Sequence, residues 1–352
     1  MDLNRLKENS NYYFSDESSS VRDAAYYSLC IGIEAYLNTY HNLVMSLTEY
    51  DRKDSNQINM RAKESEAYIR SYVDIAIHFQ HFFELEIKKC LEKENKLLAV
   101  DTKGNPVITY KLLNAIELEE NEVSSLKSVE FSEALGRLKK LVNGNYVTSD
   151  VAKVLVKNDK LLDSLNLLRN TVLHRGRRIL NYCDLDMLMT QNILPAIKEL
   201  FDLSEYVGYV RALEQQGLYS LMTELINIGK KEPFEYDTLA LKKEIGRCSL
   251  NRKTIANLDN NNEDDKDYLE LVLERSIEPC LNERYIREVK CPCCNSSTMI
   301  EGADVIGMEI DELGDEMGNG AGFSIIHIPV YMRYKNCLRC GLSVDEFLFD
   351  KI

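Results

Sequence analysis

The sequence predicts a mainly α-helical protein that ends in a small β-rich segment, and three observations lead to this prediction. Apolar residues recur at helical spacing through most of residues 12–228. A polar, acidic run without apolar residues, 259–267, follows this helical part. Residues 286–352 then contain two close pairs of cysteines and two strand-like runs.

The composition fits a cytoplasmic protein with a sizeable core. Its 352 residues allow one large domain or two to three modest ones, and an apolar content of 45% is enough to form a core. The net charge of −14 argues against a broad surface for polyanions, so any contact with nucleic acid would have to be local. The first eleven residues are charged and polar, unlike a signal peptide, and no apolar run approaches the length of a membrane span.

Two long helices are expected to begin the helical part, over residues 12–50 and 56–97. Asp16 or one of Ser18–Ser20 would cap the first helix. The second helix is unusually long, and its predicted buried face consists of Ile69, Val73, Ala76, Phe83, Ile87 and Leu91.

Shorter helices are expected to follow these two. Phe131–Leu141 has the pattern of a short amphipathic helix, and residues 150–176 form a further one. Residues 184–203 predict another helix, which Pro195 is expected to kink, and residues 204–228 predict the next.

Residues 230–257 are expected to be helical in part, and they are rich in basic side chains. These side chains would either contact nucleic acid or form an ordinary solvated helix face. They are Lys230, Lys231, Lys242, Lys243, Arg247, Arg252 and Lys253.

The segment Leu161–Arg178, LLDSLNLLRNTVLHRGRR, carries the candidate catalytic residues. Asn170 and His174 are four residues apart, so they share one helix face, and Arg169 lies on the flank of the apolar stripe. Gly176 is a candidate C-cap, which places His174 in the last turn, where the helix dipole favours an imidazolium ion. The apolar stripe on the other side of this helix consists of Leu161, Leu165, Leu168 and Val172.

Arg169, Asn170 and His174 are residue types suited to phosphate chemistry. An arginine offers a fixed fork of donors to a phosphate, and a histidine can transfer protons near neutral pH. Arg175, Arg177 and Arg178 follow directly and would provide a local contact to nucleic acid. The alternative is a solvated, arginine-rich helix end of the kind that occurs in many proteins.

The run from Leu168 to Gly176, LRNTVLHRG, resembles the signature of the HEPN superfamily: Arg, then Asn, Asp or His, then three or four residues, then His, at the end of a long helix. The segment 81–92, HFFELEIKKCLE, is similar to the second long helix of that family. The resemblance implies an antiparallel helical bundle with two long helices before the signature helix. It also implies a homodimer whose two signature helices form one composite site.

Many HEPN proteins are endoribonucleases that need no metal for catalysis. By this resemblance Arg169 would hold the scissile phosphate, Asn170 would orient the site, and His174 would act as acid and base. The RNA 2′-hydroxyl would attack and leave a 2′,3′-cyclic phosphate. A related subgroup, the nucleotide-transferring toxins, carries Tyr two residues after the His, and Gly176 at that position disfavours it.

The resemblance therefore predicts an endoribonuclease that serves as a toxin or in anti-phage (antiviral) defence. The alternative is a catalytically silent HEPN dimer that binds RNA or acts as a scaffold for other proteins. In a third hypothesis, a regulatory protein or a phage-derived trigger controls the nuclease by contacting the C-terminal segment.

Asp74, His78 and His81 lie three to four residues apart on the second expected helix. They would either supply an acidic or histidine partner to the main site or form an ordinary polar helix face. Spacing alone favours the polar face, and no third strong ligand for zinc is evident among them.

The cysteines of residues 286–352 predict a metal site. Ten cysteines at irregular positions, with two close pairs late in the chain, suggest a reducing compartment. The pairs lie in Cys291-Pro-Cys-Cys294 and Cys337-Leu-Arg-Cys340-Gly341, and each tight turn can present two thiolates to tetrahedral zinc. With the strand-like runs Tyr285–Val289 and Phe323–Tyr334 beside them, they resemble a zinc ribbon.

The expected zinc ligands are Cys291, Cys294, Cys337 and Cys340, with Cys293 as an alternative to Cys291. Cys291 is preferred because C-P-x-C is the usual turn of such ribbons. The zinc would be a structural staple, or it would support a surface that binds nucleic acid or protein.

A long insertion separates the two cysteine pairs. It holds seven acidic residues between Glu301 and Glu316, followed by the glycine-rich run 318–322. That run lacks the Gly-Lys-Ser/Thr of a P-loop and is expected to be a flexible loop. The acidic residues would repel phosphate, which favours a protein partner for this segment.

Together these features divide the chain into four parts. We expect a HEPN-type helical domain at 12–205, a helical extension at 206–258, a linker with a short helix at 259–285, and a zinc ribbon at 286–352.

Overall fold

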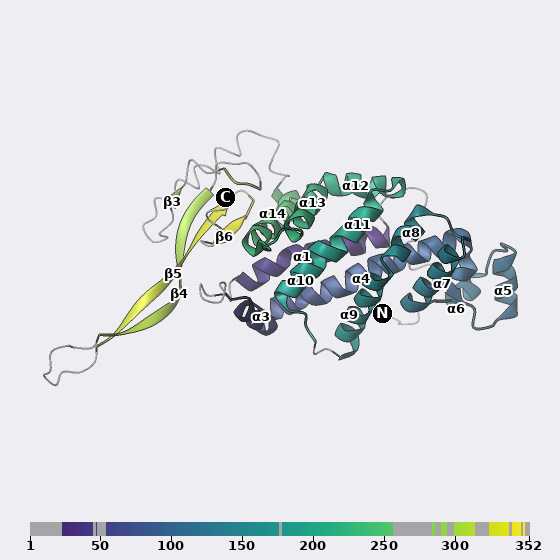
Figure 1. The fold of residues 1–352 in the computed structure, drawn as a ribbon, viewed down its shortest axis with the longest axis horizontal. Coiled ribbons are helices and arrows are strands. Elements are labelled where there is room, and N and C mark those ends of the chain that lie inside the picture. The colour runs from purple at the N-terminus through teal and green to yellow at the C-terminus, as the bar shows by residue number, and fades with distance from the viewer. Residues whose placement is uncertain are drawn as a thin grey trace. The chain divides into compact units, whose positions relative to one another are not determined.

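The computed structural model is mainly helical, with small β-sheets that include one near the C-terminus (Figure 1). The chain divides into two compact units, Met1–Gln215 and Gln216–Ile352, and this division falls within the predicted extension at 206–258. The structure describes residues 23–44, 47, 54–175, 178–255, 284–285, 290–293, 299–313, 324–337, 340–345 and 348.

Helices α1 (Ala24–Val44) and α4 (Glu66–Glu94) form the centre of the first unit. Ser28 Oγ lies 2.7 Å from His81 Nδ1, whereas Asn42 Nδ2 donates to Ser71 Oγ at 2.9 Å, so the two helices run antiparallel. Their facing sides bury large aliphatic and aromatic side chains, which supply most of the stabilisation of such a pair. These include Leu29, Tyr36, Leu37, Ile75, Phe79 and Phe83.

Asp23 marks the start of α1. Its Oδ1 accepts a hydrogen bond from the backbone N–H of Tyr26 at 3.0 Å, as an N-cap side chain does. The predicted caps, Asp16 and Ser18–Ser20, lie outside the described residues.

Residues 56–97 form two helices and not the single predicted one. Helix α3 (Ser55–Glu64) ends at Ser65, and α4 begins directly after it. Ser65 has an extended backbone, and its hydroxyl accepts the N–H of Tyr68 at 3.2 Å, so a single residue caps both helices.

The predicted buried face of this segment is correct in its C-terminal part. Ala76, Phe83, Ile87 and Leu91 are buried, as expected. Ile69 and Val73 are half-buried, because the helix turns residues such as Tyr68 and Tyr72 into the core there.

A short irregular region follows α4, and α7 (Phe131–Asn143) then confirms the predicted amphipathic helix. In between, two short strands pair in antiparallel fashion, with Val100 opposite Ser128. The elements of this region are η3 (Lys96–Leu98), β1 (Val100–Asp101), α5 (Pro106–Leu113), α6 (Glu120–Ser125) and β2 (Lys127–Ser128).

The segment predicted as one helix over 150–176 also contains two helices, α8 (Asp150–Lys157) and α9 (Asp159–Arg175), which meet at Asn158. Past α9, residues 182–201 are helical throughout, but the hydrogen-bond pattern becomes π-helical just before Pro195. Proline has no N–H to donate, which explains why the regular α-helical hydrogen-bond pattern is lost beside Pro195; the predicted kink itself stays a prediction. The three segments are α10 (Tyr182–Leu188), the π-helical η4 (Met189–Ile193) and α11 (Leu194–Phe201).

The helix predicted over residues 204–228 is interrupted at Gly217. This residue has a φ of +70°, a left-handed conformation that glycine adopts at little cost. The segment therefore consists of η5 (Ser204–Tyr206), α12 (Val207–Glu214) and α13 (Leu218–Gly229).

A polar network joins η5 and α12 to the two central helices of the first unit. Tyr206 Oη donates to Glu86 Oε2 at 2.5 Å, and Tyr209 Oη donates to Asp23 Oδ1 at 2.6 Å. Lys89 Nζ pairs with Glu86 at 2.7 Å and with Asp23 at 2.5 Å. Glu86 is only 4% exposed, so these partners satisfy a carboxylate that burial alone would destabilise.

The second unit contains α13, α14 (Tyr236–Ile255) and an antiparallel four-stranded sheet of order β3-β4-β5-β6. Strands β4 and β5 pair from Met299↔Cys337 to Leu313↔Ser324, with one irregularity between Val305 and Gly307. The strands are β3 (Arg284–Tyr285), β4 (Met299–Leu313), β5 (Ser324–Cys337) and β6 (Ser343–Asp345).

Strand β5 matches the run predicted at Phe323–Tyr334, but β4 was not predicted, because its acidic residues are unfavourable for strands. Residues 259–283 of the predicted linker and short helix and the glycine-rich run 318–322 lie outside the described residues, and the last two residues of the predicted linker segment form β3. Among the helices that the structure describes, none has the length and apolarity that crossing a membrane requires.

Candidate functional site

Helix α9, which carries the predicted catalytic residues, is anchored through its N-terminal half. It packs against α4 and α7, and Leu162 and Leu165 are buried there. Asn166 Nδ2 donates to Ser132 Oγ of α7 at 2.9 Å. Of the predicted apolar stripe, Leu165 is buried, whereas the other three members are half-buried: Leu161, Leu168 and Val172.

The polar group of α9 lies in its C-terminal half. Arg169 and Asn170 are half-buried, and Arg169 Nη1 donates to Asn170 Oδ1 at 3.0 Å. His174 is exposed in the last turn of the helix. This bond orients the guanidinium of Arg169. Because a guanidinium has five N–H donors, the others remain available for a ligand.

The three arginines predicted to bind RNA can be described only in part. Arg178 is exposed. The side chain of Arg175 and all of Arg177 lie outside what the structure describes, as does Gly176, the expected C-cap.

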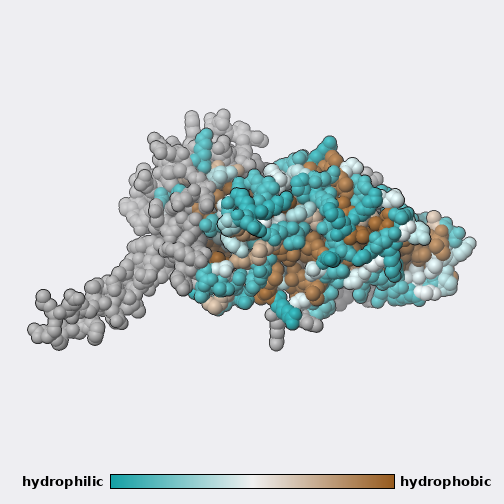
Figure 2. Space-filling view, viewed as in Figure 1, coloured by the Kyte–Doolittle hydropathy of each residue, from teal (hydrophilic) through white to brown (hydrophobic). Residues whose placement is uncertain are grey.

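Two exposed leucines border the polar group of α9. Leu167 is 69% exposed and Leu173 is 47% exposed. Leu167, Asn170 and His174 follow helical spacing, so they share one face. Figure 2 shows patches of hydrophobic residues, in brown, among the hydrophilic residues of the helical part in view.

Asp74, His78 and His81 have the properties of a polar helix face in contact with α1. Asp74 is exposed, and His81 bonds Ser28 as described above. His78 Nδ1 is buried without a hydrogen-bond partner in the described structure, and burial lowers the pKa of His78, an effect that Asp74 opposes. Within the described ranges, no hydrogen bond or ion pair links these three residues to Arg169 or His174.

A polar cavity of about 620 Å³ lies between α1 and α4. Acidic residues and an arginine line this cavity, so its charge does not favour one class of ligand. Neither Arg169 nor His174 borders it. Its lining includes Glu34, Asn38, Asn42, Arg70, Ser71 and Asp74.

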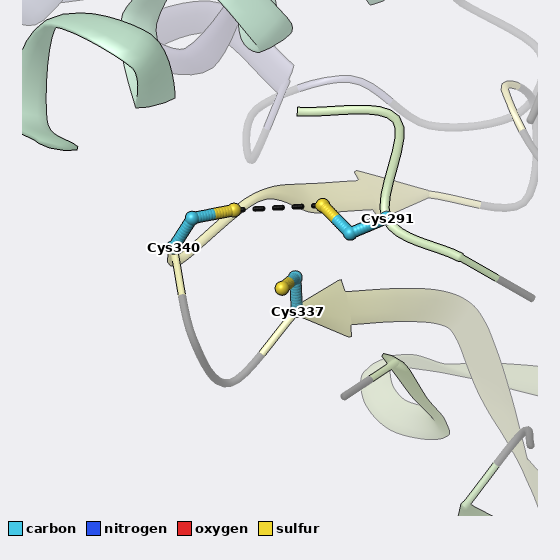
Figure 3. A group of neighbouring side chains, drawn as sticks. All are labelled: Cys291, Cys337 and Cys340. Carbon is cyan, nitrogen blue, oxygen red and sulfur yellow. Dashed lines mark hydrogen bonds between the residues drawn. The ribbon is translucent and has the colours of Figure 1, made fainter. Parts of the chain in front are cut away.

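The second unit holds a compact cluster of three buried cysteines: Cys291, Cys337 and Cys340. Their sulfur atoms all lie within 4.8 Å of one another, and the three residues are 1%, 1% and 4% exposed. Figure 3 shows Cys291 and Cys340 with their sulfur atoms pointing at each other, 3.5 Å apart.

The turn after β5 presents two of these thiols from one short segment. The Gly341 N–H donates to Cys337 O at 2.9 Å, and the Cys337 N–H donates to Leu342 O at 2.8 Å. Gly341 has a φ of +69°, which a side chain would make unfavourable. The backbone thus folds tightly enough for Cys337 and Cys340 to converge.

The donor set fits a metal ion. Thiolates bound to tetrahedral zinc at about 2.3 Å lie about 3.8 Å from each other, close to the separations found here. Soft sulfur ligands suit zinc and similar ions better than magnesium or calcium. The cluster could therefore bind a metal, with Cys291, Cys337 and Cys340 as ligands.

Cys293 is not part of this cluster, which supports the choice of Cys291 over it. The thiol of Cys293 lies 3.6 Å from Ser249 Oγ and donates to Ile245 O at 3.7 Å. Its backbone N–H donates to Cys291 Sγ at 3.4 Å. Cys294, the remaining predicted ligand, lies outside the described residues.

The basic residues of 230–257 are not all on a solvated face. Lys243 is fully buried, and the side chain of Arg247 is only 13% exposed. Helical spacing did not identify these two residues as buried, because a basic residue gives the same sequence pattern whether it faces solvent or a neighbouring acidic residue. Lys231 and Lys242 form ion pairs with Glu235 and Glu224.

No protein-family model matches this chain, and neither the curated proteins nor the solved structures contain a match to it.

Proposed function

We propose that this chain is a metal-independent endoribonuclease of the HEPN type. The observation that supports this most directly is the arrangement on α9, where Arg169 is held by Asn170 at 3.0 Å and His174 is exposed in the last turn. The helix packs on α4, one of two long antiparallel helices that precede it, which agrees with the bundle that the sequence resemblance implies.

In this proposal each residue has one role. Arg169 binds the scissile phosphate through the donors that its bond to Asn170 leaves available. Asn170 keeps the guanidinium in place, and His174 takes the proton of the RNA 2′-hydroxyl or gives one to the leaving oxygen. The exposed position of His174 gives a large substrate access to the imidazole.

The test is cleavage of end-labelled single-stranded RNA and tRNA by the purified chain in the presence of EDTA. We expect cutting that leaves a 2′,3′-cyclic phosphate and falls by about 10²–10⁴-fold in His174→Ala, the usual contribution of a general acid or base. Asp163→Ala is the matched control, because Asp163 is exposed on the same helix about three turns earlier.

Other outcomes would point elsewhere. Equal cutting by the wild-type protein and His174→Ala would show that His174 is not the catalyst. RNA binding without cutting in both proteins would favour the silent, RNA-binding scaffold. In the toxin or anti-phage role, expression of the wild-type chain would stop the growth of a bacterial host, and expression of His174→Ala would not.

We also propose that two copies of the chain meet through α9 and share the site. Leu167 supports this, because it is 69% exposed on the face that carries Asn170 and His174, and a second helix would cover it. Leu167→Glu should give a monomer in sedimentation velocity and abolish cleavage without changing a catalytic residue. Leu113→Glu, at a leucine of α5 that is 60% exposed, is the control; a fully active monomer would contradict the composite site.

For the second unit we propose a structural zinc site formed by Cys291, Cys294, Cys337 and Cys340. The support is the buried cluster of three thiols, to which the predicted fourth ligand is close in sequence. One zinc per chain in metal analysis of the purified protein, lost in Cys337→Ser, is the expected result. The acidic segment between the cysteine pairs would then be the contact for a regulatory protein.

A further inference from the structure

One face of α14 carries a buried charged pair beside the cysteine cluster. Glu244, Arg247 and Cys248 share this face, and the side chains of Glu244 and Arg247 are 1% and 13% exposed. Arg247 Nε donates to Glu244 Oε2 at 2.9 Å, and its Nη2 bonds the other carboxylate oxygen. The same Nη2 lies 3.4 Å from the carbonyl oxygen of Gly341, the residue that follows Cys340.

A second contact joins α14 to the other cysteine turn. The thiol of Cys293 lies against Ser249 and Ile245, while the N–H of Cys293 donates to Cys291 Sγ. Helix α14 therefore contacts the turns of both cysteine pairs, one through Arg247 and the other through Cys293.

Burying an ion pair often costs more free energy of desolvation than the attraction between its charges returns, so a further interaction is needed to offset this cost. The proposed metal site provides such an interaction. Four thiolates and one divalent ion carry a net charge of about −2, and the ligands of metal sites are commonly held and tuned by outer hydrogen bonds. A guanidinium beside this cluster offsets the negative charge and holds the turn that presents Cys337 and Cys340.

We propose that Arg247 is a positioning residue of the metal centre. Glu244 orients its guanidinium, which fixes the Gly341 turn and stabilises the thiolate form of the cluster. The inference rests on the zinc proposal, and it makes α14 part of the metal-binding module. Metal binding and the packing of α14 are then coupled, so each strengthens the other.

The test measures zinc affinity of the full chain by competition with a chromophoric chelator. Arg247→Ala should bind zinc about 10–100-fold more weakly, the usual effect of losing an outer-shell partner, and Arg247→Lys should recover part of the loss. Lys242→Ala is the matched control. It removes a cation from the same helix, but this cation pairs with Glu224 at 2.6 Å.

Glu244→Gln separates an electrostatic role from simple packing. This change keeps the size of the side chain but removes the charge that orients the guanidinium, so zinc affinity should fall, though by less than in Arg247→Ala, because Arg247 itself is kept. Zinc affinity that is unchanged or higher in Glu244→Gln would show that Glu244 does not orient Arg247 and would overturn the proposal. Cobalt-substituted Arg247→Ala should keep the absorption of a four-thiolate site, because the ligands themselves are unchanged.

Two further results have distinct meanings. If the wild-type chain binds no zinc, the zinc proposal fails and this inference fails with it. If the wild-type chain binds zinc and Arg247→Ala binds it equally well, the zinc site stands and only the role of Arg247 is refuted.

Discussion

Gly32 of α1 lies so close to Phe79 of α4 that a methyl group at Gly32 would come within 3.1 Å of ring atom Cε2. Carbon atoms in good contact are about 3.5–4.0 Å apart, so Gly32→Ala would overpack the interface. The substitution gains about 1 kcal/mol of helix propensity, whereas overpacking costs about 1–3 kcal/mol. We therefore expect the free energy of unfolding to stay the same or to fall by up to about 2 kcal/mol.

Gly32→Ala should instead raise the free energy of unfolding when the ring of Phe79 is removed. Phe79→Ala alone costs about 3–5 kcal/mol, because it opens a cavity at a fully buried position. In that background Gly32→Ala should stabilise by about 1 kcal/mol, since the methyl group enters vacated space. Urea unfolding followed by the helical circular dichroism signal measures all four proteins. Equal stabilisation by Gly32→Ala in both backgrounds would show that α1 and α4 do not meet at these residues.

Three further predictions concern single features of the structure. Burial raises the pKa of Asp23, but the hydrogen bond from Lys89 contributes to a net lowering from 3.8. The Asp23–Lys89 pair therefore stabilises the fold above this pH, and its contribution is lost as the pH falls through the lowered pKa. The urea midpoints of wild type and Asp23→Asn should converge in acid, and a difference that stays constant with pH would contradict this. Ser65→Ala should lower the free energy of unfolding by about 1 kcal/mol through loss of an N-cap, and no change would mean that Ser65 does not cap α4. Cys291→Ser should remove bound zinc while Cys293→Ser retains it, as metal analysis can show; the opposite pattern would make Cys293 the ligand.

The sequence predicted the helices better than their ends. Four of the six positions that apolar periodicity assigned to the buried face of α4 are buried, because burial on one face imposes that spacing. The pattern gave no sign of the break between α3 and α4 at Ser65. That break depends on one hydroxyl group and one backbone conformation, which periodicity does not report. The break at Gly217 was missed for a similar reason, since a glycine within an apolar pattern does not reveal its φ.

The two candidate sites differ in how far their geometry follows from sequence. The spacing of Arg169, Asn170 and His174 on a helix predicts a shared side of α9, but the bond between Arg169 and Asn170 depends on rotamers that spacing does not fix. Two cysteine pairs predict a cluster, whereas the distinction between Cys291 and Cys293 requires the packing of α14. The sequence did not link Arg247 to the cysteine cluster, because its partner Gly341 is distant in sequence.

The contacts of Tyr206 and Tyr209 define how long an independently folding fragment must be. A fragment cut at residue 205, the predicted end of the helical domain, would lack both tyrosines. Glu86 would keep its position in the core with Lys89 as its remaining partner in the network, and Asp23 would lose the Tyr209 hydroxyl at the start of α1. Expression of the first unit by itself should therefore succeed when the fragment extends through Gln215 and give insoluble protein when it stops ten residues earlier.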